Sequence, residues 1–564
     1  MMRLAPVVLA ALCVATLFLG LDRVGFLDTR EARDAEVVRE MVRRKEALTP
    51  LYARQAWFEK PVLAYAPEAV LREIAHRTPT PVLTLGKPPA PARSRQLRAL
   101  LAVALILAAA SLGARLFGLR AAWCAAAVLA TTLSLPLAAR TDGTQLLGTL
   151  LGWVGAAGLA DALFGRRGGR DARLIVTYGA LGAALACVGP LAALWPLGGL
   201  ALYVALARDR AGWRRARPLP GLAIIAGLGL PWYGAMVERH GFSFLLRAAF
   251  FPYASEPPGT WFAGPALALG FLVVGFFPWS ALLPAAIQHA ATWWRAIRLP
   301  LLGRRPGPSG DGADRPRYDP LARERREEGE AHFLIACLFA ALVPVALYPG
   351  PPLPAALPAL PAAALLCGRY LDHLLEDPDR LRGSFGGAVR MMALVGTGGA
   401  LLLALAAPRL REASPELRLL ATVLLVTSWA PFLANFVGRR RLAAALMVLP
   451  VALGAPVASL RVLPALEPWL SARLVAAAAS VAVPPGAPLV LGEPPPATLR
   501  LYGERNLVVT DSLAADLPRL RAGDGMTYLA FRPGRESEVA RAAREPLDIL
   551  LRTPSLVLAR VRPS

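Results

Sequence analysis

The chain alternates long apolar segments with short polar connections over most of its length. Apolar runs of roughly 17 to 25 residues recur up to about residue 461, and such a run can cross a hydrocarbon layer about 30 Å thick. The pattern therefore predicts a polytopic, all-α membrane protein with about 13 transmembrane helices. We place them at 4–21, 96–118, 121–139, 143–164, 173–189, 190–207, 218–238, 264–287, 331–348, 354–372, 386–407, 415–437 and 442–461.

Basic residues distinguish the two sides of the predicted bundle. Arg-rich connections at 165–173, 208–217, 295–330 and 438–441 alternate with connections that carry few basic residues. Short loops rich in Lys and Arg remain in the cytoplasm, whereas long translocated loops escape this rule. The pattern predicts a cytoplasmic N-terminus, a cytoplasmic Pro/Gly-rich linker at 295–330, and an external position for the first loop (22–95) and the C-terminal tail.

The end of the chain has a different pattern. Short alternating stretches such as "LVLARVR" are typical of strands, and "ESEVARAARE" has the spacing of a helix. We therefore expect a transmembrane domain over 1–463 and a small α/β domain over 464–564. Its expected order is helix, strand, helix, strand, strand, helix, strand, strand.

Composition supports this interpretation. Hydrophobic residues make up 55% of the chain, charged residues 18%, and the mean hydropathy is +0.47, which is unusual for a soluble protein. The net charge of +23 follows the predicted loops and forms no separate basic domain, so we expect no nucleic-acid partner. The five cysteines are widely spaced in apolar runs, which indicates neither a disulfide framework nor a zinc cluster.

The long first loop contains a predicted amphipathic helix. Residues 28–46, "DTREARDAEVVREMVRRKE", place Ala35, Val38 and Val42 at helical spacing, with charged residues elsewhere. This pattern is typical of a helix that lies in the membrane interface.

Three groups of charged residues are predicted to reach the same external side. Asp28 and Glu31 begin the interfacial helix, "FEKP" at 58–61 follows it, and "RTD" at 140–142 ends the third predicted span. We expect these groups to converge on one pocket, whose arginines and lysine suit a phosphate ligand.

Each of these side chains also has a purely structural interpretation. Asp28 can cap the helix, with Glu31 completing a capping box. Lys60 can extend to lipid headgroups and Arg140 can anchor a span end. Asp142 can cap the helix that follows it.

The first-loop motifs resemble the signature of the ArnT/PMT-like polyprenyl-phosphate-sugar glycosyltransferases, which have the C-type glycosyltransferase fold. "REARDAEVVREM", "LTP" and "FEKP" with the following "LAY" correspond to that signature, and the spacing between its parts matches without a gap. "ARTDG" (139–143), "LPWYGAMVERHGFSFLLRAAFF" (230–251) and "FFPWSALLP" (276–284) resemble later segments of the family. The resemblance covers nearly the whole chain.

The resemblance implies transfer of a sugar from an undecaprenyl-phosphate carrier to lipid A, another envelope glycan or a protein. The reaction would take place at the periplasmic face of the bacterial inner membrane, with inversion at the anomeric carbon. A carboxylate must take or orient the proton of the acceptor hydroxyl, and cations must stabilise the departing phosphate. We expect catalytic roles for Asp28, Glu31 and Asp142, substrate binding by Arg33, Glu59, Lys60 and Arg140, and a divalent metal ion held by Glu59.

The chain also departs from the family pattern. Arg30 stands where the family usually has an acid, Asp34 replaces the usual Tyr, and "VGP" (188–190) replaces K-G-P. These changes leave a second hypothesis, a catalytically silent membrane scaffold that binds a partner through its tail. A transporter of lipid-linked substrates is a third hypothesis, which the lack of a charged relay within the spans disfavours.

Overall fold

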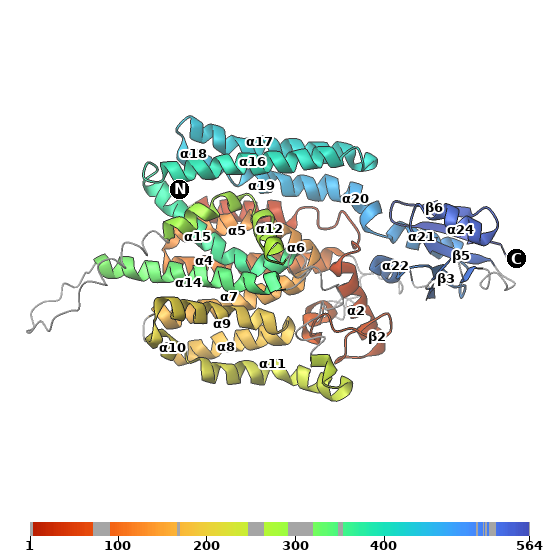
Figure 1. Ribbon diagram of the computed structural model, residues 1–564, viewed down its shortest axis with the longest axis horizontal. Helices are drawn as coiled ribbons and strands as arrows, with labels where there is room; N and C mark the ends of the chain where they lie inside the picture. The colour runs from red at the N-terminus through yellow and green to blue at the C-terminus, as the bar shows by residue number, and fades with distance from the viewer. Residues whose placement is uncertain are drawn as a thin grey trace, which may run out of the picture.

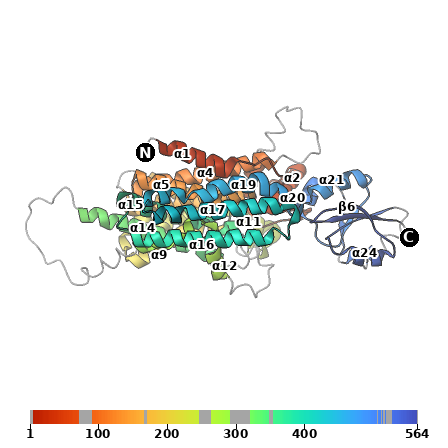
Figure 2. The same ribbon diagram turned by 90° about the horizontal axis from the view of Figure 1, so that it is seen from above.

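A long helical bundle carries a small sheet domain at one end (Figure 1). In this computed structural model the first helix begins at the opposite end of the bundle from the sheet domain (Figure 2). Residues 295–319 of the predicted linker and 71–90 of the first loop lie outside the described residues, whereas 320–330, predicted as linker, form the start of a helix that continues to Leu347. The structure describes residues 4–70, 91–165, 170–245, 264–290, 320–347, 353–503, 506–510, 512–513, 516–517 and 526–562.

Eight helices of the described residues are long and apolar enough to cross a membrane, or up to ten if each of two bent pairs forms one span. The chain is therefore a multi-pass membrane protein, whereas the predicted count of 13 is not confirmed. The eight are α4 (Pro91–Leu116), α7 (Gly143–Phe164), α9 (Pro190–Ala207), α10 with α11 (Arg210–Ala216, Pro218–His240), the part of α14 (Pro320–Leu347) from Glu327 to Ala346, α16 (Arg382–Ala406), η8 with α17 (Arg411–Ala413, Ser414–Phe436) and α18 to α20 (Arg440–Leu446, Leu449–Val457, Leu463–Leu470).

The remaining predicted spans are helical but shorter, bent or more charged. The N-terminal helix, α1 (Ala5–Cys13) with η2 (Val14–Phe18), falls short of a full span, α8 (Arg170–Cys187) begins with three charged residues among its first four, and α15 (Leu360–Glu376) has 17 residues. The bent pairs are α5 (Leu119–Ala130) with α6 (Ser134–Thr141), at 56°, and Ala268–Gly275 of α12 (Gly264–Gly275) with Trp279–Ala290, at 116°.

The bend between α5 and α6 has a local cause. The Thr131 and Thr132 hydroxyl groups donate to the carbonyl oxygens of Ala127 and Val128, both at 2.7 Å, and such bonds compete with the helical ladder. Pro136 further on has no backbone N–H to continue that ladder. The bend brings the end of α6 to the end of the bundle that carries the sheet domain (Figure 1).

The C-terminal domain is a five-stranded sheet with the strand order β4-β3-β5-β7-β6. β3 runs parallel to β4 and β5, whereas β7 runs antiparallel to β5 and β6. The eight predicted helices and strands of the tail occur in the predicted order, and the described residues Leu513, Asp516 and Leu517 add helical turns between the fourth and fifth of them that were not predicted. Its elements are α21 (Arg473–Ala482), β3 (Leu489–Leu491), α22 (Ala497–Tyr502), β4 (Leu507–Val509), β5 (Thr527–Phe531), α24 (Glu536–Ala543), β6 (Asp548–Arg552) and β7 (Val557–Val561).

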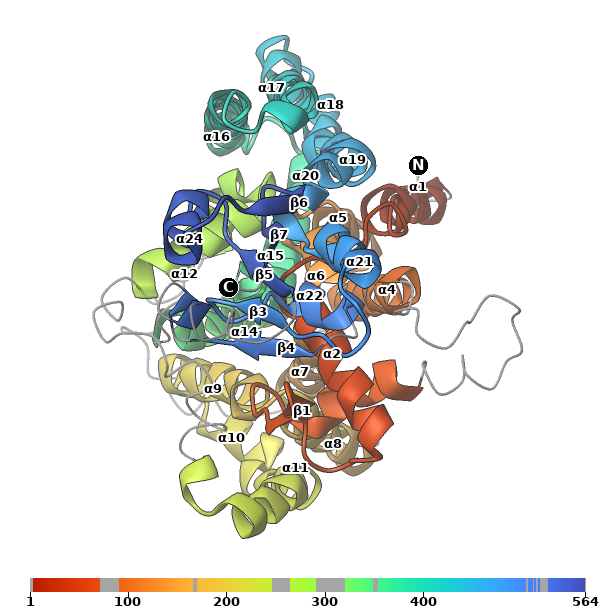
Figure 3. The same cartoon turned by 90° about the vertical axis from the view of Figure 1, so that its right-hand side faces the viewer.

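Alternation along β3 builds a core on both faces of this sheet. Leu489 and Leu491 join the apolar cluster that includes α21 and α22, whereas Val490 joins the cluster that includes α24. Successive strand residues point to opposite faces, so three apolar residues in a row require helices on both sides. The views along and across the long axis show this arrangement (Figures 2 and 3).

The predicted interfacial helix is α2 (Arg30–Arg44), which lies between the bundle and the sheet domain (Figure 1). Thr29 caps it by accepting the backbone N–H of Glu31 at 3.3 Å. Ala32 and Ala35 pack against α22, while the face with Val38 packs into the main core. A short hairpin, β1 (Leu51–Tyr52) and β2 (Gln55–Ala56), follows it.

Candidate active site

Three segments far apart in the sequence meet at the end of the bundle that carries the sheet domain. α2 supplies Arg30 and Asp34, the loop after β2 supplies Glu59 and Lys60, and the junction of α6 and α7 supplies Asp142. The predicted convergence of "FEKP" with the "RTD" segment is therefore present in the fold.

Lys60 lies at the centre of this group. Its Nζ is 2.7 Å from Asp34 Oδ2 and 3.7 Å from Asp142 Oδ1, and all three side chains are buried. Asp142 also caps α7, because its Oδ1 accepts the backbone N–H of Gln145 at 3.1 Å. The predicted cap and the ion pair are thus made by the same carboxylate.

Two arginines of α2 surround Glu59. Arg30 Nε is 3.1 Å from Glu59 Oε1, and Arg33 Nη1 is 3.0 Å from Glu59 Oε2. Arg30 Nη1 also reaches Asp142 Oδ2 at 3.3 Å, so Arg30 joins the two halves of the network. We call this network the ion cluster; its members are Arg30, Arg33, Asp34, Glu59, Lys60 and Asp142.

Burial and neighbouring charges give the carboxylates of the ion cluster different pKa values. Burial raises the pKa of Asp34 to about 6, although Lys60 opposes the shift. Burial also acts on Asp142 and Glu59, but Lys60 and Arg30 outweigh it and hold the pKa of both groups below the ordinary value. Asp34 is therefore the acid whose pKa lies closest to neutral pH in this cluster.

A small cavity of ≈ 30 Å³ adjoins the ion cluster. Asp34, Tyr65 and Arg98 form polar parts of its wall, and Leu97 and Leu101 of α4 belong to its apolar wall. In the described part of the chain, Asp34 Oδ1 and the Tyr65 hydroxyl are buried without a hydrogen-bond partner. Buried polar atoms without a partner are rare in proteins, so the two atoms mark a place where a ligand or water can bind.

Glu31, predicted to be catalytic, lies in a separate network. Its carboxylate accepts hydrogen bonds from Arg95 Nε at 2.8 Å, from Arg95 Nη2 at 2.7 Å and from Arg98 Nη1 at 3.1 Å. Arg95 also donates to the carbonyl oxygens of Leu21, Val24 and Gly25. Two guanidinium groups thus hold Glu31 in a fully buried position, and this geometry suits a structural role.

Asp28 and Arg140 also lie outside the ion cluster. Asp28 is exposed, and its Oδ1 accepts the backbone N–H of Thr498 at 3.3 Å, at the start of α22. Arg140 donates to the carbonyl oxygens of Thr16, Pro136 and Leu19 at 3.2, 2.9 and 2.8 Å. Arg140 therefore ties the end of α6 to the first helix.

The fit of a divalent metal ion can be tested on Glu59. Both of its oxygen atoms are paired with arginines, and the part of the chain that the structure describes contains no group of three His, Cys, Asp or Glu side chains that could hold a metal. The donor set at Glu59 does not fit a metal ion.

Two members of the ion cluster, Arg30 and Asp34, are not among the site residues expected from the sequence. In the sequence they stand out only as departures from the family pattern. In the structure Arg30 contacts Glu59 and Asp142, and Asp34 contacts the buried Lys60. Their spacing of four residues on a predicted helix places them on one face, and this signal was available in the sequence.

Comparisons with known proteins find similar structures but no matching sequence family and no matching curated sequence. A scan of protein-family models gives no match, and no curated protein matches in sequence. The crystal structure of ArnT from Cupriavidus metallidurans bound to undecaprenyl phosphate has a TM-score of 0.73 and 19% identity, covering 98% of this chain and 97% of that one. The same enzyme in the apo state has a TM-score of 0.70 and 19% identity, with 99% and 97% covered.

A third structure is less similar. The Archaeoglobus fulgidus oligosaccharyltransferase tethered with an acceptor peptide has a TM-score of 0.48 and 11% identity, covering 96% of this chain and 70% of that one. The similarity to ArnT over nearly the full length establishes the fold. The chain has an ArnT-like, C-type glycosyltransferase fold.

Proposed function

We propose that the chain transfers a sugar from an undecaprenyl-phosphate carrier to an envelope acceptor at the periplasmic face of the bacterial inner membrane. Two observations support the proposal: the fold of an ArnT that was crystallised with undecaprenyl phosphate, and the ion cluster beside a cavity with apolar walls. The acceptor class is lipid A, another envelope glycan or a protein.

The observation that carries the proposal is the free oxygen of Asp34. Asp34 Oδ1 is buried without a partner among the described residues, while its Oδ2 contacts Lys60 at 2.7 Å. Its pKa of about 6 suits a general base at neutral pH. Asp34 thus takes the role of general base, which was expected of Asp28, Glu31 or Asp142.

The transfer follows from these positions. The acceptor hydroxyl oxygen attacks the anomeric carbon, and its proton moves to Asp34 Oδ1. The bond between the anomeric carbon and the phosphate oxygen breaks, and undecaprenyl phosphate leaves with the electron pair. Lys60 and Arg98, which border the same region, stabilise the charge that develops on the phosphate.

The carrier lipid enters along the apolar wall of the cavity. Leu97 and Leu101 on α4 and Leu147 on α7 line it. Its volume of ≈ 30 Å³ is close to that of a single water molecule in the liquid. Binding of the carrier therefore requires this cavity to widen.

One observation favours the silent scaffold. Lys60 is already neutralised by Asp34 and Asp142, so a phosphate must compete with two carboxylates for it. The deciding experiment is the incorporation of labelled sugar from membrane extracts into any acceptor. Wild-type chain that gives no transfer with any polyprenyl-phosphate sugar would establish the scaffold.

Asp34→Asn should lower transfer by at least about a hundredfold, the smaller end of general acid–base effects. The wild-type rate should rise as pH increases through about 6, because Asp34 accepts a proton only when ionised, and then level off. The variant should lose this rise. Initial rates of labelled-sugar transfer between pH 5 and 8 measure both effects.

Asp28→Asn is the matched control for this experiment. The same chemical change at the capping position of α22 should keep the rate and its pH dependence. A rise through pH 6 that survives in Asp34→Asn would remove Asp34 from the base role.

A further inference from the structure

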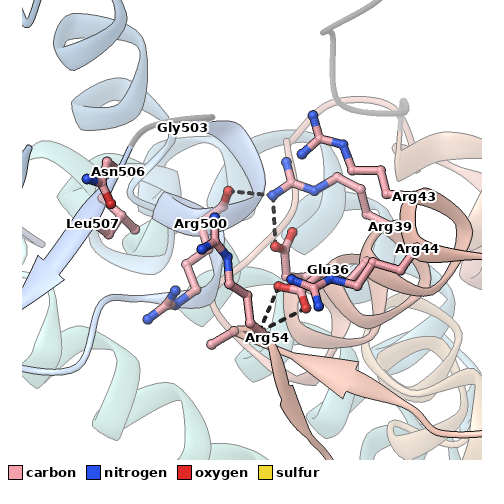
Figure 4. A pocket seen from close by; sticks show the side chains of 11 residues that line it. Glu36, Arg39, Arg43, Arg44, Arg54, Arg500, Gly503, Asn506 and Leu507 are labelled. Atoms are coloured by element: carbon pink, nitrogen blue, oxygen red, sulfur yellow. Dashed lines mark hydrogen bonds and ion pairs between the residues drawn. The ribbon is translucent and has the colours of Figure 1, made fainter. Parts of the chain in front are cut away.

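Two cavities lie beside α2, and they differ in size and in the residues that line them. The larger, of ≈ 850 Å³, lies between α2, the β1–β2 hairpin and the sheet domain, and arginines such as Arg43 and Arg54 line it (Figure 4). The smaller, of ≈ 30 Å³, is the cavity beside Asp34. No described residue lines both, so the smaller cavity is a separate site, which we call the Asp34 cavity.

Three buried polar atoms at the Asp34 cavity have no hydrogen-bond partner in the described part of the chain. They are Asp34 Oδ1, the Tyr65 hydroxyl and Arg98 Nε. Their residues belong to α2, to the position after η3 (Val62–Ala64) and to α4, and all three line the cavity. The exposed fraction of each residue is 6% or less. Because buried polar atoms without a partner are rare, three of them at one cavity indicate that a polar molecule binds among them.

A glycine leaves room for Arg98 at the wall of the Asp34 cavity. Gly143 follows Asp142 at the start of α7 and lines the cavity. A Cβ atom at this position would lie 2.9 Å from Arg98 Cγ and 3.1 Å from Arg98 Nε, whereas carbon atoms in contact prefer about 3.5–4.0 Å. Any larger residue at 143 would therefore displace the guanidinium group from the cavity.

The size and the chemistry of the Asp34 cavity fit one water molecule. A water molecule takes up about 30 Å³ in the liquid, and inside proteins it has two to four polar partners. Ionised Asp34 accepts hydrogen bonds, Arg98 Nε donates one, and a tyrosine hydroxyl can do either. Burial raises the pKa of Tyr65 well above its ordinary value, so its hydroxyl keeps the proton and can donate it.

We propose that the Asp34 cavity binds one water molecule, through which Tyr65 and Arg98 hold the carboxylate of Asp34 in place. The water donates to Asp34 Oδ1 and accepts from Arg98 Nε and from the Tyr65 hydroxyl. Tyr65 is thus a positioning residue, because it acts on Asp34 through the water. During transfer the acceptor hydroxyl replaces the water. This last step rests on the proposed function, whereas the water site itself does not.

Other groups around Asp34 act on the same carboxyl. Burial raises the pKa of Asp34, Lys60 lowers it from a distance of 2.7 Å, and Asp142 and Glu59 raise it. The proposed water adds a donor at the other oxygen, and a donor favours the ionised form. Removal of the water, or of the Tyr65 hydroxyl that orients it, should therefore raise the pKa of Asp34 further.

Tyr65→Phe removes the hydroxyl and keeps the ring. The midpoint for ionisation of Asp34, about 6 in the wild type, should rise by about one pH unit, which is what one hydrogen bond to a charged group is worth. Infrared spectra of the full chain in phosphatidylcholine nanodiscs, recorded across this pH range, measure the midpoint without any substrate. The C=O stretch of protonated Asp34 is the band that Asp34→Asn removes.

Tyr52→Phe is the matched control, because it removes a hydroxyl from the β1–β2 hairpin, outside the Asp34 cavity. This variant should keep the wild-type midpoint. Ala64→Val tests the water itself, since Ala64 lines the cavity and a larger side chain there fills the space of the water. The midpoint should rise as in Tyr65→Phe. Adding Tyr65→Phe to Ala64→Val should move it no further, because both changes act through the same water.

Each contrary result has a definite meaning. A wild-type midpoint in Tyr65→Phe would overturn the positioning role of Tyr65. A further rise when Tyr65→Phe is added to Ala64→Val would show that the hydroxyl acts on Asp34 directly, and would overturn the water site.

Transfer assays link the water site to the reaction. The pH dependence of kcat/KM reports the free enzyme, so its midpoint should rise in Tyr65→Phe by the same amount as the infrared midpoint. An unchanged kcat/KM midpoint would overturn the positioning role in transfer. A raised infrared midpoint in a chain that transfers no sugar would contradict the transferase function and leave the water site standing.

Discussion

Lys60→Met should reduce sugar transfer by at least about a thousandfold, since removal of one pre-organised donor costs 10²- to 10³-fold and Lys60 also orients Asp34. Its Nζ lies 2.7 Å from Asp34 Oδ2 and 3.7 Å from Asp142 Oδ1. The departing phosphate thus loses its nearest cation and the base loses its partner. Labelled-sugar transfer in membranes with matched expression measures the effect.

The control for Lys60→Met separates chemistry from folding. Lys45→Met makes the same change at an exposed residue that ends α2, and its transfer should equal that of wild type. Lys60→Met alone leaves the buried Asp34 without its cation and Asp142 with only Arg30, and breaking a buried ion pair from one side costs about 3–5 kcal/mol. The double variant Lys60→Met with Asp34→Asn should recover most of that stability and still fail to transfer.

A contrary result for Lys60 is easily recognised. If the double variant regains both its unfolding temperature and its transfer rate, Lys60 serves folding only. The silent scaffold would then be the better account of the ion cluster.

Arg95→Met should destabilise the protein by about 3–5 kcal/mol, the cost of breaking a buried ion pair from one side. Glu31 is fully buried and Arg95 is 1% exposed, and their bidentate contact at 2.7 and 2.8 Å leaves the carboxylate dependent on these guanidinium groups. The three carbonyl oxygens that Arg95 satisfies lose their donor as well. The thermal unfolding midpoint of the purified chain in detergent measures the loss.

Two further variants test this explanation. Arg93→Met changes an exposed arginine two residues earlier on α4 and should leave the midpoint unchanged. The pair Arg95→Met with Glu31→Leu should recover much of the stability, because apolar residues of similar size can replace a buried ion pair. Equal unfolding midpoints for Arg95→Met and Arg93→Met would show that the ion pair of Arg95 with Glu31 adds little to the stability of the protein.

Much of the fold could be predicted from local pattern. The apolar runs identified the membrane helices, and the alternating stretches of the tail identified its helices and strands in the right order. The count of 13 spans is not confirmed because hydropathy carries no information on bending. Thr131, Thr132 and Pro136 divide one apolar run into two helices at 56°.

The candidate site was only partly predictable. The pairing of Lys60 with Asp142 follows from topology, since both residues were expected on one side of the membrane, and the structure brings them together. The partners of Glu31 were not predictable, because Arg95 and Arg98 lie more than sixty residues away on α4. A carboxylate at a helix start has the same local signature whether it caps, pairs or reacts.

By itself, the sequence determined the class of the protein, a multi-pass membrane chain with a small α/β tail, because burial in lipid or in a core imposes a period on apolar residues. Only the tertiary structure decided which of its acidic residues is the candidate base. Asp34 retains a free buried oxygen, whereas Glu31 is neutralised and Asp28 caps a helix of another domain. Charge interactions and desolvation depend on distance in space, and that distance arises only when α2, α4, α7 and the sheet domain have packed together.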